Sequence, residues 1–181
     1  MTRAWTREGL EHQPYFCEEN VWHLLRSAKP LPPAVHAVFV TGPSGRVVMA
    51  RQRAAPPGSR LAWDYHVFVL WGRGAPATVL DLDTRLDFPC DAAVYLEESF
   101  PRGVDPSEQP LFRPIAGETY LRTLETDRRH MVDAHGRYTQ PAPSWPLLTP
   151  GRSNLSCFTD IHDERLGSWL DLPQFHLQFC A

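Results

Sequence analysis

Two β-forming runs, separated by only five residues, constrain the fold of this chain more than any other feature. LAWDYHVFVLW (residues 61–71) and ATVLDLD (residues 77–83) are rich in β-branched and aromatic residues. The intervening GRGAP supplies the glycine and proline typical of a turn. The pattern predicts a hairpin of two antiparallel strands, and we expect this hairpin to form the centre of a sheet.

The alternation of side chains along this hairpin predicts which of them meet. If the turn is centred on residues 73–74, His66 lies directly opposite Asp81, and Asp64 lies opposite Asp83. Side chains alternate across a strand with a period of two, so these four polar side chains share one face. We therefore expect one chemical face and one packed face, the latter formed by Trp63, Tyr65, Val67, Val69, Leu80 and Leu82.

The segments before the hairpin predict a helix and a second strand pair. Residues 18–28 carry apolar side chains at the spacing of an amphipathic helix, and Pro30 ends that pattern. Residues 34–40 and 46–52 are two β-rich runs joined by TGPSG, a turn sequence. We expect these two runs to pair with each other.

The segments after the hairpin add further helices. Residues 90–100 and 117–131 have helical spacing, residues 172–180 fit a helix or a strand, and the proline-rich residues 141–150 predict a loop. The length of 181 residues, 43% of them hydrophobic, suits one compact core and is too short for two ordinary domains. We expect one α+β domain over residues 1–181, with a mostly antiparallel sheet packed by helices.

Charge and composition exclude several classes of protein. A net charge of −3 argues against a nucleic-acid surface, which requires a basic face, and no apolar run is long enough to span a bilayer. The first sixteen residues lack the apolar stretch of a signal peptide. The cysteines are too scattered for a disulfide framework, which favours a reduced, cytoplasmic compartment: they are Cys17, Cys90, Cys157 and Cys180.

Three residue types at these positions make a nucleophilic constellation. Cys17 directly precedes the first predicted helix, where the helix dipole favours a thiolate with a pKa below the ordinary value of about 8.5. His66 can accept the thiol proton and later donate it, and Asp81 can orient His66 and favour its charged form. The chain order of cysteine, histidine and aspartate matches the papain and transglutaminase arrangement.

Several longer motifs also resemble one known family, the protein N-terminal glutamine amidohydrolases. The motifs cover nearly the whole chain and occur in the family's order: YFCEENVWHL, WDYHVFVL, DLDTRLDFPC, DRRHMVD, NLSCFTDI and LPQFHLQF. The resemblance implies that Cys17 is the nucleophile, His66 the catalytic histidine and Asp81 the aspartate of a triad. In eukaryotes this family feeds a degradation pathway that reads N-terminal residues.

The implied reaction converts the side chain of an N-terminal glutamine into glutamate through a cysteine thioester. It needs no cofactor, and its substrates are proteins or peptides with a free N-terminal glutamine. We expect the enzyme to act as a monomer. Recognition of the free α-amino group requires a carboxylate near the thiol, for which Glu19 is the first choice among four candidates: Glu18, Glu19, Asp64 and Asp83.

Other interpretations of the same residues stay open. A papain-like peptidase or a transglutaminase-like acyltransferase would use the same triad on another carbonyl, and a module that only binds N-termini would need no turnover. Cys17 alone is typical of a buried space-filler, and Glu18 and Glu19 are also favourable charges in a first helical turn. Metal catalysis is the main chemical rival, but neither CFTDIHDE nor DRRHMVDAH has a known zinc spacing.

Overall fold

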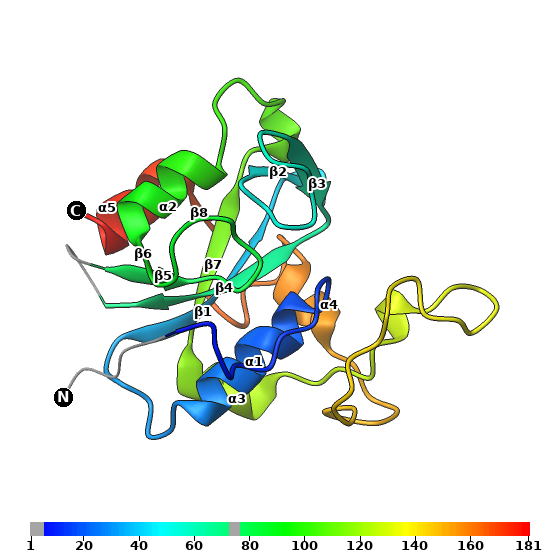
Figure 1. The fold of residues 1–181 in the computed structure, drawn as a ribbon. Coiled ribbons are helices and arrows are strands. Elements are labelled where there is room, and N and C mark those ends of the chain that lie inside the picture. The colour runs from blue at the N-terminus through cyan, green and yellow to red at the C-terminus, as the bar shows by residue number, and fades with distance from the viewer. Residues whose placement is uncertain (1–5, 73–76) are drawn as a thin grey trace.

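A six-stranded sheet, antiparallel at every pairing, organises the chain in a computed structural model that describes residues 6–72 and 77–181 (Figure 1). Its strands, in order across the sheet, are β6 (Cys90–Asp91), β5 (Thr78–Leu80), β4 (His66–Trp71), β1 (Val35–Thr41), β7 (Leu111–Ala116) and β8 (Leu170–Asp171). A separate two-stranded sheet contains β2 (Val47–Ala50) and β3 (Arg60–Trp63).

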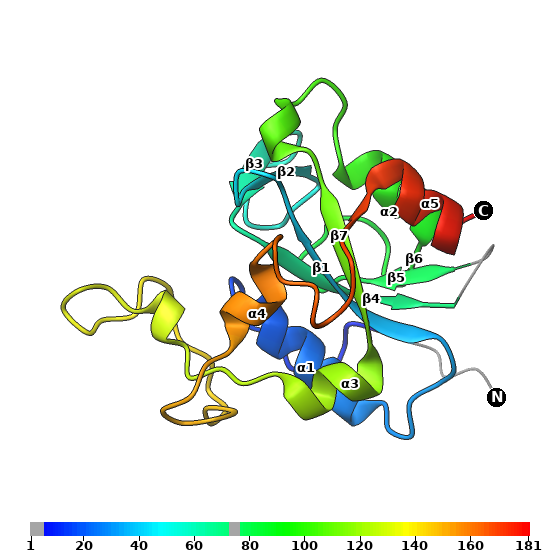
Figure 2. The ribbon, with the colours of Figure 1, turned by 180° about the vertical axis from the view of Figure 1, so that it is seen from behind.

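Helices cover both faces of the large sheet (Figures 1 and 2). One face packs against α1 (Cys17–Ser27), α3 (Gly117–Thr123) and α4 (Leu155–Thr159), and the other against α2 (Ala92–Ser99) and α5 (Leu172–Phe179). Two short 3₁₀ turns are η1 (Pro106–Glu108) and η2 (Arg129–Met131). The predicted α+β class is confirmed. Among the described helices, none has the length and apolarity needed to cross a membrane.

The local helix predictions are correct in position, although the helix predicted over residues 117–131 ends at Thr123. α1 begins one residue before the predicted segment and buries Val21, Leu24 and Leu25 against the sheet, as their spacing requires. The predicted helical segments 90–100 and 117–131 contain α2 and α3, and the segment 172–180 forms α5. Residues 141–150 form no helix or strand, as predicted.

The central hairpin forms, but its register differs from the predicted one. Val69 pairs with Leu80, two residues beyond its predicted partner Thr78, and the ladder of β4 with β5 ends at this pair. A shift of two residues equals the side-chain period, so the side chains paired in this ladder keep their predicted faces. Trp63, which precedes β4, does not: it packs with the cluster on the opposite face and stacks on His66. The turn predicted at residues 73–74 lies outside the described residues.

Two other sheet predictions are wrong. Phe68 and Leu70 share the face of His66 and are fully buried against α2, so both faces of β4 are packed and no separate chemical face exists. The predicted pairing of residues 34–40 with 46–52 is also absent. β1 is buried along almost its whole length and has β4 and β7 on its two edges, which leaves no edge for β2.

Candidate active site

The cysteine at the start of α1 lines a pocket. Cys17 is the first residue of α1, and the residue is only 8% exposed. The pocket has a volume of about 300 Å³, and its wall includes Cys17, His66 and Asp83 together with the aromatic rings of Tyr15 and Trp63. The structure therefore brings the thiol and the predicted histidine to one cavity, although they are far apart in the sequence.

The predicted histidine and aspartate are in direct contact. Nε2 of His66 lies 3.0 Å from Oδ2 of Asp81, and both side chains are buried. Asp81 reaches His66 from beyond the end of β5, because the chain turns there and the Asp83 backbone N–H donates to Oδ1 of Asp81 at 2.9 Å. The contact was predicted from a facing register that does not exist, and a turn produces it instead. Since Nε2 faces Asp81, Nδ1 is the ring nitrogen left for a second partner.

The electrostatics of this pair follow from its burial and charge. Burial alone would lower the pKa of His66, but the charge of Asp81 and its hydrogen bond outweigh burial and raise that pKa. Burial alone would raise the pKa of Asp81, yet His66 and the donated hydrogen bonds lower it. Asp81 is thus held ionised beside an imidazole that binds a proton more readily than usual.

The thiol differs from the sequence-based expectation. We expected the helix dipole to favour the thiolate, but burial raises the pKa of Cys17 well above its ordinary value, and the charges of Glu18 and Asp83 raise it further. The Val67 backbone N–H acts in the opposite direction. Free Cys17 is therefore a thiol at neutral pH, and its ionisation requires a base.

Glu19, our first choice for the amine-binding carboxylate, is occupied elsewhere. It is fully buried, and its two oxygens accept hydrogen bonds from Nε and Nη2 of Arg128, both at 2.7 Å. Nε1 of Trp145 donates to the same carboxylate at 2.6 Å. Glu19 is not among the residues that line the pocket. This geometry argues against contact between Glu19 and a substrate amine.

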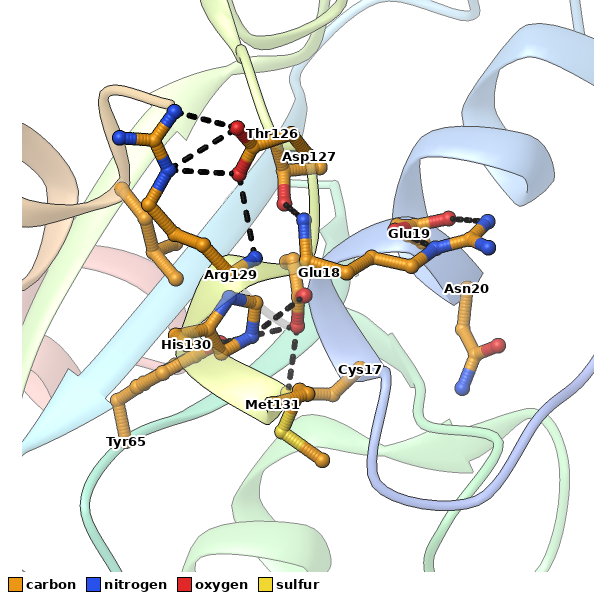
Figure 3. Close-up of polar contacts among 12 residues, drawn as sticks. Cys17, Glu18, Glu19, Asn20, Tyr65, Thr126, Asp127, Arg129, His130 and Met131 are labelled. Atoms are coloured by element: carbon orange, nitrogen blue, oxygen red, sulfur yellow. Dashed lines mark hydrogen bonds and ion pairs between the residues drawn. The ribbon is translucent and has the colours of Figure 1, made fainter. Parts of the chain in front are cut away.

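The other three carboxylates lie closer to the pocket. Asp64 and Asp83 line it, and Oδ1 of Asp83 lies 2.7 Å from Nε2 of His12. Glu18 is buried behind the wall, where Tyr65 donates to one oxygen at 3.0 Å and Nε2 of His130 lies 3.2 Å from the other (Figure 3). Asp83 is thus the carboxylate that is both open to the pocket and adjacent to His66.

The two sequence segments considered as metal sites do not bring their ligand atoms together in the part of the chain that the structure describes. Within residues 6–72 and 77–181, neither CFTDIHDE nor DRRHMVDAH places three metal-ligating atoms close together. The group that does so is His66, Asp81 and Asp83, whose candidate ligand atoms lie within 4.8 Å of one another. These three residues already have hydrogen-bonding partners, among them one another and His12.

Several residues of the site were not predicted from the sequence. Tyr95 of α2 donates its hydroxyl hydrogen to Oδ2 of Asp81 at 2.8 Å. Arg128 and His130 belong to DRRHM, a stretch noted for its family resemblance, its metal-ligand types and its helical spacing, and Trp145 lies in the proline-rich loop. Sequence spacing gave no signal for these contacts, since Arg128 and Trp145 meet Glu19 across 109 and 126 residues.

A buried thiol that shares a pocket with a carboxylate-bound imidazole is the catalytic arrangement typical of a cysteine-dependent hydrolase. Comparison with known proteins narrows this class. A family model described as N-terminal glutamine amidase matches residues 12–179. The chain belongs to the N-terminal glutamine amidase family, a family of enzymes.

Individual relatives agree with this assignment. The chain is 34% identical to the protein N-terminal glutamine amidohydrolase of Bos taurus, a match that covers 97% of this chain and 89% of the bovine protein. Proteins of the same name from Danio rerio and Homo sapiens are 36% and 33% identical. Those matches cover 84% and 89% of this chain, and 79% and 82% of the zebrafish and human proteins.

Proposed function

We propose that this enzyme deamidates the side chain of an N-terminal glutamine, yielding an N-terminal glutamate and ammonia. The observation that carries the proposal is the contact of Asp81 with His66, which lines the same pocket as Cys17. The names and coverage of the relatives support the same substrate.

In the first half of the reaction, Sγ of Cys17 attacks the amide carbon while His66 removes the thiol proton. The raised pKa of Cys17 supports this general-base route over a preformed thiolate. The oxyanion that forms requires N–H donors. The backbone N–H of Cys17 is the natural first donor, because Cys17 is the first residue of α1 and the first N–H groups of a helix have no acceptor within the helix.

Collapse of the tetrahedral intermediate breaks the bond between the carbon and the nitrogen. His66 gives its proton to the departing nitrogen, so that ammonia leaves and a thioester to Cys17 remains. Water then attacks the thioester with His66 as base, and the proton returns to the thiol. Asp81 keeps His66 in one orientation and stabilises its charged form through both steps. Thiol, imidazole and water suffice for this chemistry, so the reaction needs no cofactor.

Selection of the first residue requires a carboxylate that meets the α-amino group. Asp83 fits this role best, because it lines the pocket and its oxygen lies within 4.8 Å of a ring nitrogen of His66. In glutamine, four bonds separate the α-nitrogen from the amide carbon, and asparagine is one methylene shorter. An ammonium group bound by Asp83 would therefore hold glutamine, but not asparagine, with its amide at Cys17. Asp64 is exposed at the rim, and Glu18 is covered by Tyr65 and His130.

The wider architecture proposed from the sequence is consistent with this role. α1 begins at Cys17, and the chain order of cysteine, histidine and aspartate supports a papain- or transglutaminase-like arrangement. We infer a single catalytic domain over residues 1–181 that acts as a cytoplasmic monomer on proteins and peptides, and that binds neither nucleic acid nor membrane.

Two alternatives use the same residues. A peptidase or acyltransferase would direct the thiol at another carbonyl, and a binding module would hold N-termini without turnover. Ammonia release from a glutamine-initiated peptide, compared with asparagine-initiated, internal-glutamine and N-acetylated peptides, separates them. We expect release from the first peptide alone. Equal turnover of free and acetylated peptides would favour the peptidase or acyltransferase, and absence of turnover would favour the binding module.

A further inference from the structure

One wall of the pocket comes from a long segment with little regular structure. Residues 127–149 contain only the 3₁₀ turn η2 and an isolated bridge between Val132 and Tyr138, and they extend away from the sheet beside α1 (Figures 1 and 2). His130, Met131, Thr139 and Gln140 from this segment line the pocket. We call residues 127–149 the wall segment. Internal hydrogen bonds shape the tip of this segment, among them those from the Asp133 N–H to the Arg137 carbonyl at 2.8 Å and from the Thr139 N–H to the Met131 carbonyl at 2.9 Å. The position of that tip relative to Cys17 depends on what holds the segment to α1.

Both ends of the wall segment are held by one carboxylate. Glu19, two residues after Cys17 on α1, accepts two hydrogen bonds from Arg128 at the start of the segment and one from Trp145 near its end. Arg128 also donates to the backbone carbonyl oxygens of Trp145 at 3.0 Å and Pro146 at 3.3 Å. Glu19, Arg128 and Trp145 therefore close the segment into a loop, and we call these three residues the latch.

The energetics of the latch differ from those of a surface ion pair. The side chain of Arg128 is 4% exposed and that of Glu19 is fully buried, so the bidentate pair is neither hydrated nor strongly screened by salt. Arg128 also adopts a φ of +63°, a left-handed conformation that residues other than glycine rarely adopt. Such a conformation persists only where surrounding contacts enforce it.

Glu18, the residue before Glu19, also connects α1 to the wall segment. Glu18 contacts His130, the residue two positions after Arg128, and it also contacts Tyr65 and Cys17 (Figure 3). Consecutive glutamates next to the thiol thus hold consecutive parts of the wall segment. A displacement at Arg128 would move His130 and Met131 relative to Cys17.

From this geometry we propose that the latch is a positioning device that sets the substrate wall of the pocket. Glu19 and Arg128 do not touch the substrate. They fix His130 and Met131 at the distance from Cys17 that the glutamine side chain requires. The inference rests on the proposed deamidation and deepens it, since it assigns substrate affinity to residues outside the pocket.

The test compares three latch variants with a matched control. Glu19→Gln removes the charge but keeps the shape, Arg128→Lys keeps the charge but cannot form the bidentate pair, and Trp145→Phe removes one donor. The control is Arg137→Ala, which breaks an ion pair with Asp133 inside the same wall segment where Arg137 is 74% exposed. Exposed pairs of that kind contribute little to stability or position.

We expect KM for a glutamine-initiated peptide to rise about ten- to a hundredfold in Glu19→Gln and Arg128→Lys, because small misplacements of a binding wall have effects of that size. We expect kcat and the rate of Cys17 alkylation by iodoacetamide, followed on the Cys17 peptide by mass spectrometry, to stay within about threefold of wild type, because the latch touches neither the thiol nor His66. The KM of Trp145→Phe should lie between that of wild type and that of Glu19→Gln. The KM and kcat of Arg137→Ala should match those of wild type. A purely structural role would lower the melting temperature without separating KM from kcat.

Two further measurements keep failure of the latch distinct from failure of the proposed reaction. Peptide binding in a Cys17→Ala background requires no turnover, and Glu19→Gln should weaken it as much as it raises KM. Tryptic cleavage after Arg129 in the native protein reports on the wall segment without any substrate, and it should accelerate in Glu19→Gln but not in Arg137→Ala. Unchanged cleavage and unchanged affinity in Glu19→Gln would overturn the proposal. Loss of discrimination between free and acetylated peptides in that variant would also overturn it, by showing that Glu19 binds the amine itself.

Discussion

The hydroxyl of Tyr95 donates to Oδ2 of Asp81 at 2.8 Å, on the same oxygen that faces His66. Tyr95 comes from α2, whereas Asp81 lies in the turn after β5, so a helix on one face of the sheet fixes the aspartate. The Asp83 backbone N–H holds the other oxygen of Asp81. The orientation of His66 is therefore determined by contacts that reach the interior of the core.

Removal of this hydroxyl gives a first prediction. Tyr95→Phe should lower kcat about tenfold with little change in KM, because a hydrogen bond to a charged group is worth about 1.5–3 kcal/mol and the ring still fills its site. Steady-state kinetics with a glutamine-initiated peptide measure this change, and urea unfolding provides the control for stability. An unchanged kcat in a folded variant would mean that Tyr95 only packs.

The two aspartates of the turn should have separable effects. Asp81→Asn should lower kcat by about 10⁴, the scale seen when a triad carboxylate loses its charge, because His66 loses both its orientation and its stabilising charge. Asp83→Asn should lower kcat far less and act mainly on KM. Kinetic constants of the two purified variants decide the matter. Equal losses of kcat in the two variants, or a larger loss in Asp83→Asn, would show that Asp81 is not the residue that orients His66.

The pH dependence follows from the raised pKa of His66. His66 must be neutral to accept the thiol proton, so activity should rise with pH as the imidazole loses its proton. Burial opposes this shift but Asp81 outweighs it, and the acidic limb of kcat/KM should have its midpoint above the ordinary histidine value of about 6.5. In Asp81→Asn the residual activity should show that limb at lower pH. A wild-type midpoint well below 6.5 would indicate a preformed thiolate–imidazolium pair instead.

The amine-binding carboxylate gives a fourth prediction. Acetylation of the peptide should lower wild-type kcat/KM about a hundredfold, since loss of a buried charge partner costs about 2–5 kcal/mol. Asp83→Asn should abolish most of that discrimination, because the unpaired carboxylate is gone. Comparison of kcat/KM for free and acetylated peptides in both proteins measures the effect. If Asp83→Asn discriminates as well as wild type, another carboxylate binds the amine.

The parts of the fold predicted from sequence are those that depend on local patterns. The stripe of Val21, Leu24 and Leu25 was sufficient to place α1 to within one residue, because helical periodicity is encoded within a few turns. The strand run 61–71 was recognised but not its interruption at Asp64, where a bend separates β3 from β4. Pairing of β2 with β3 instead of β1 depends on which edges the rest of the sheet leaves free, and no local pattern contains that information.

The site shows the same division. The contact between His66 and Asp81 was predicted, but the turn at residues 81–83 that produces it was not. The prediction assumed a register for β4 and β5 that differs from the observed one by two residues, and the spacing of the two runs does not determine that register. The residue types of Glu18 and Glu19 suggested an amine-binding role. Their partners Arg128 and His130 lie more than a hundred residues away, and only the folded chain reveals that these carboxylates hold the wall segment.

The most direct test of the central claim is mass spectrometry of a glutamine-initiated peptide incubated with the purified protein and with its Cys17→Ala variant. We predict that the wild-type protein converts only the first residue, from glutamine to glutamate, and leaves the peptide backbone intact, whereas Cys17→Ala and His66→Ala leave the peptide unchanged. A cleaved backbone, a peptide joined to an added amine, or equal conversion by the Cys17→Ala variant would contradict deamidation through a Cys17 thioester.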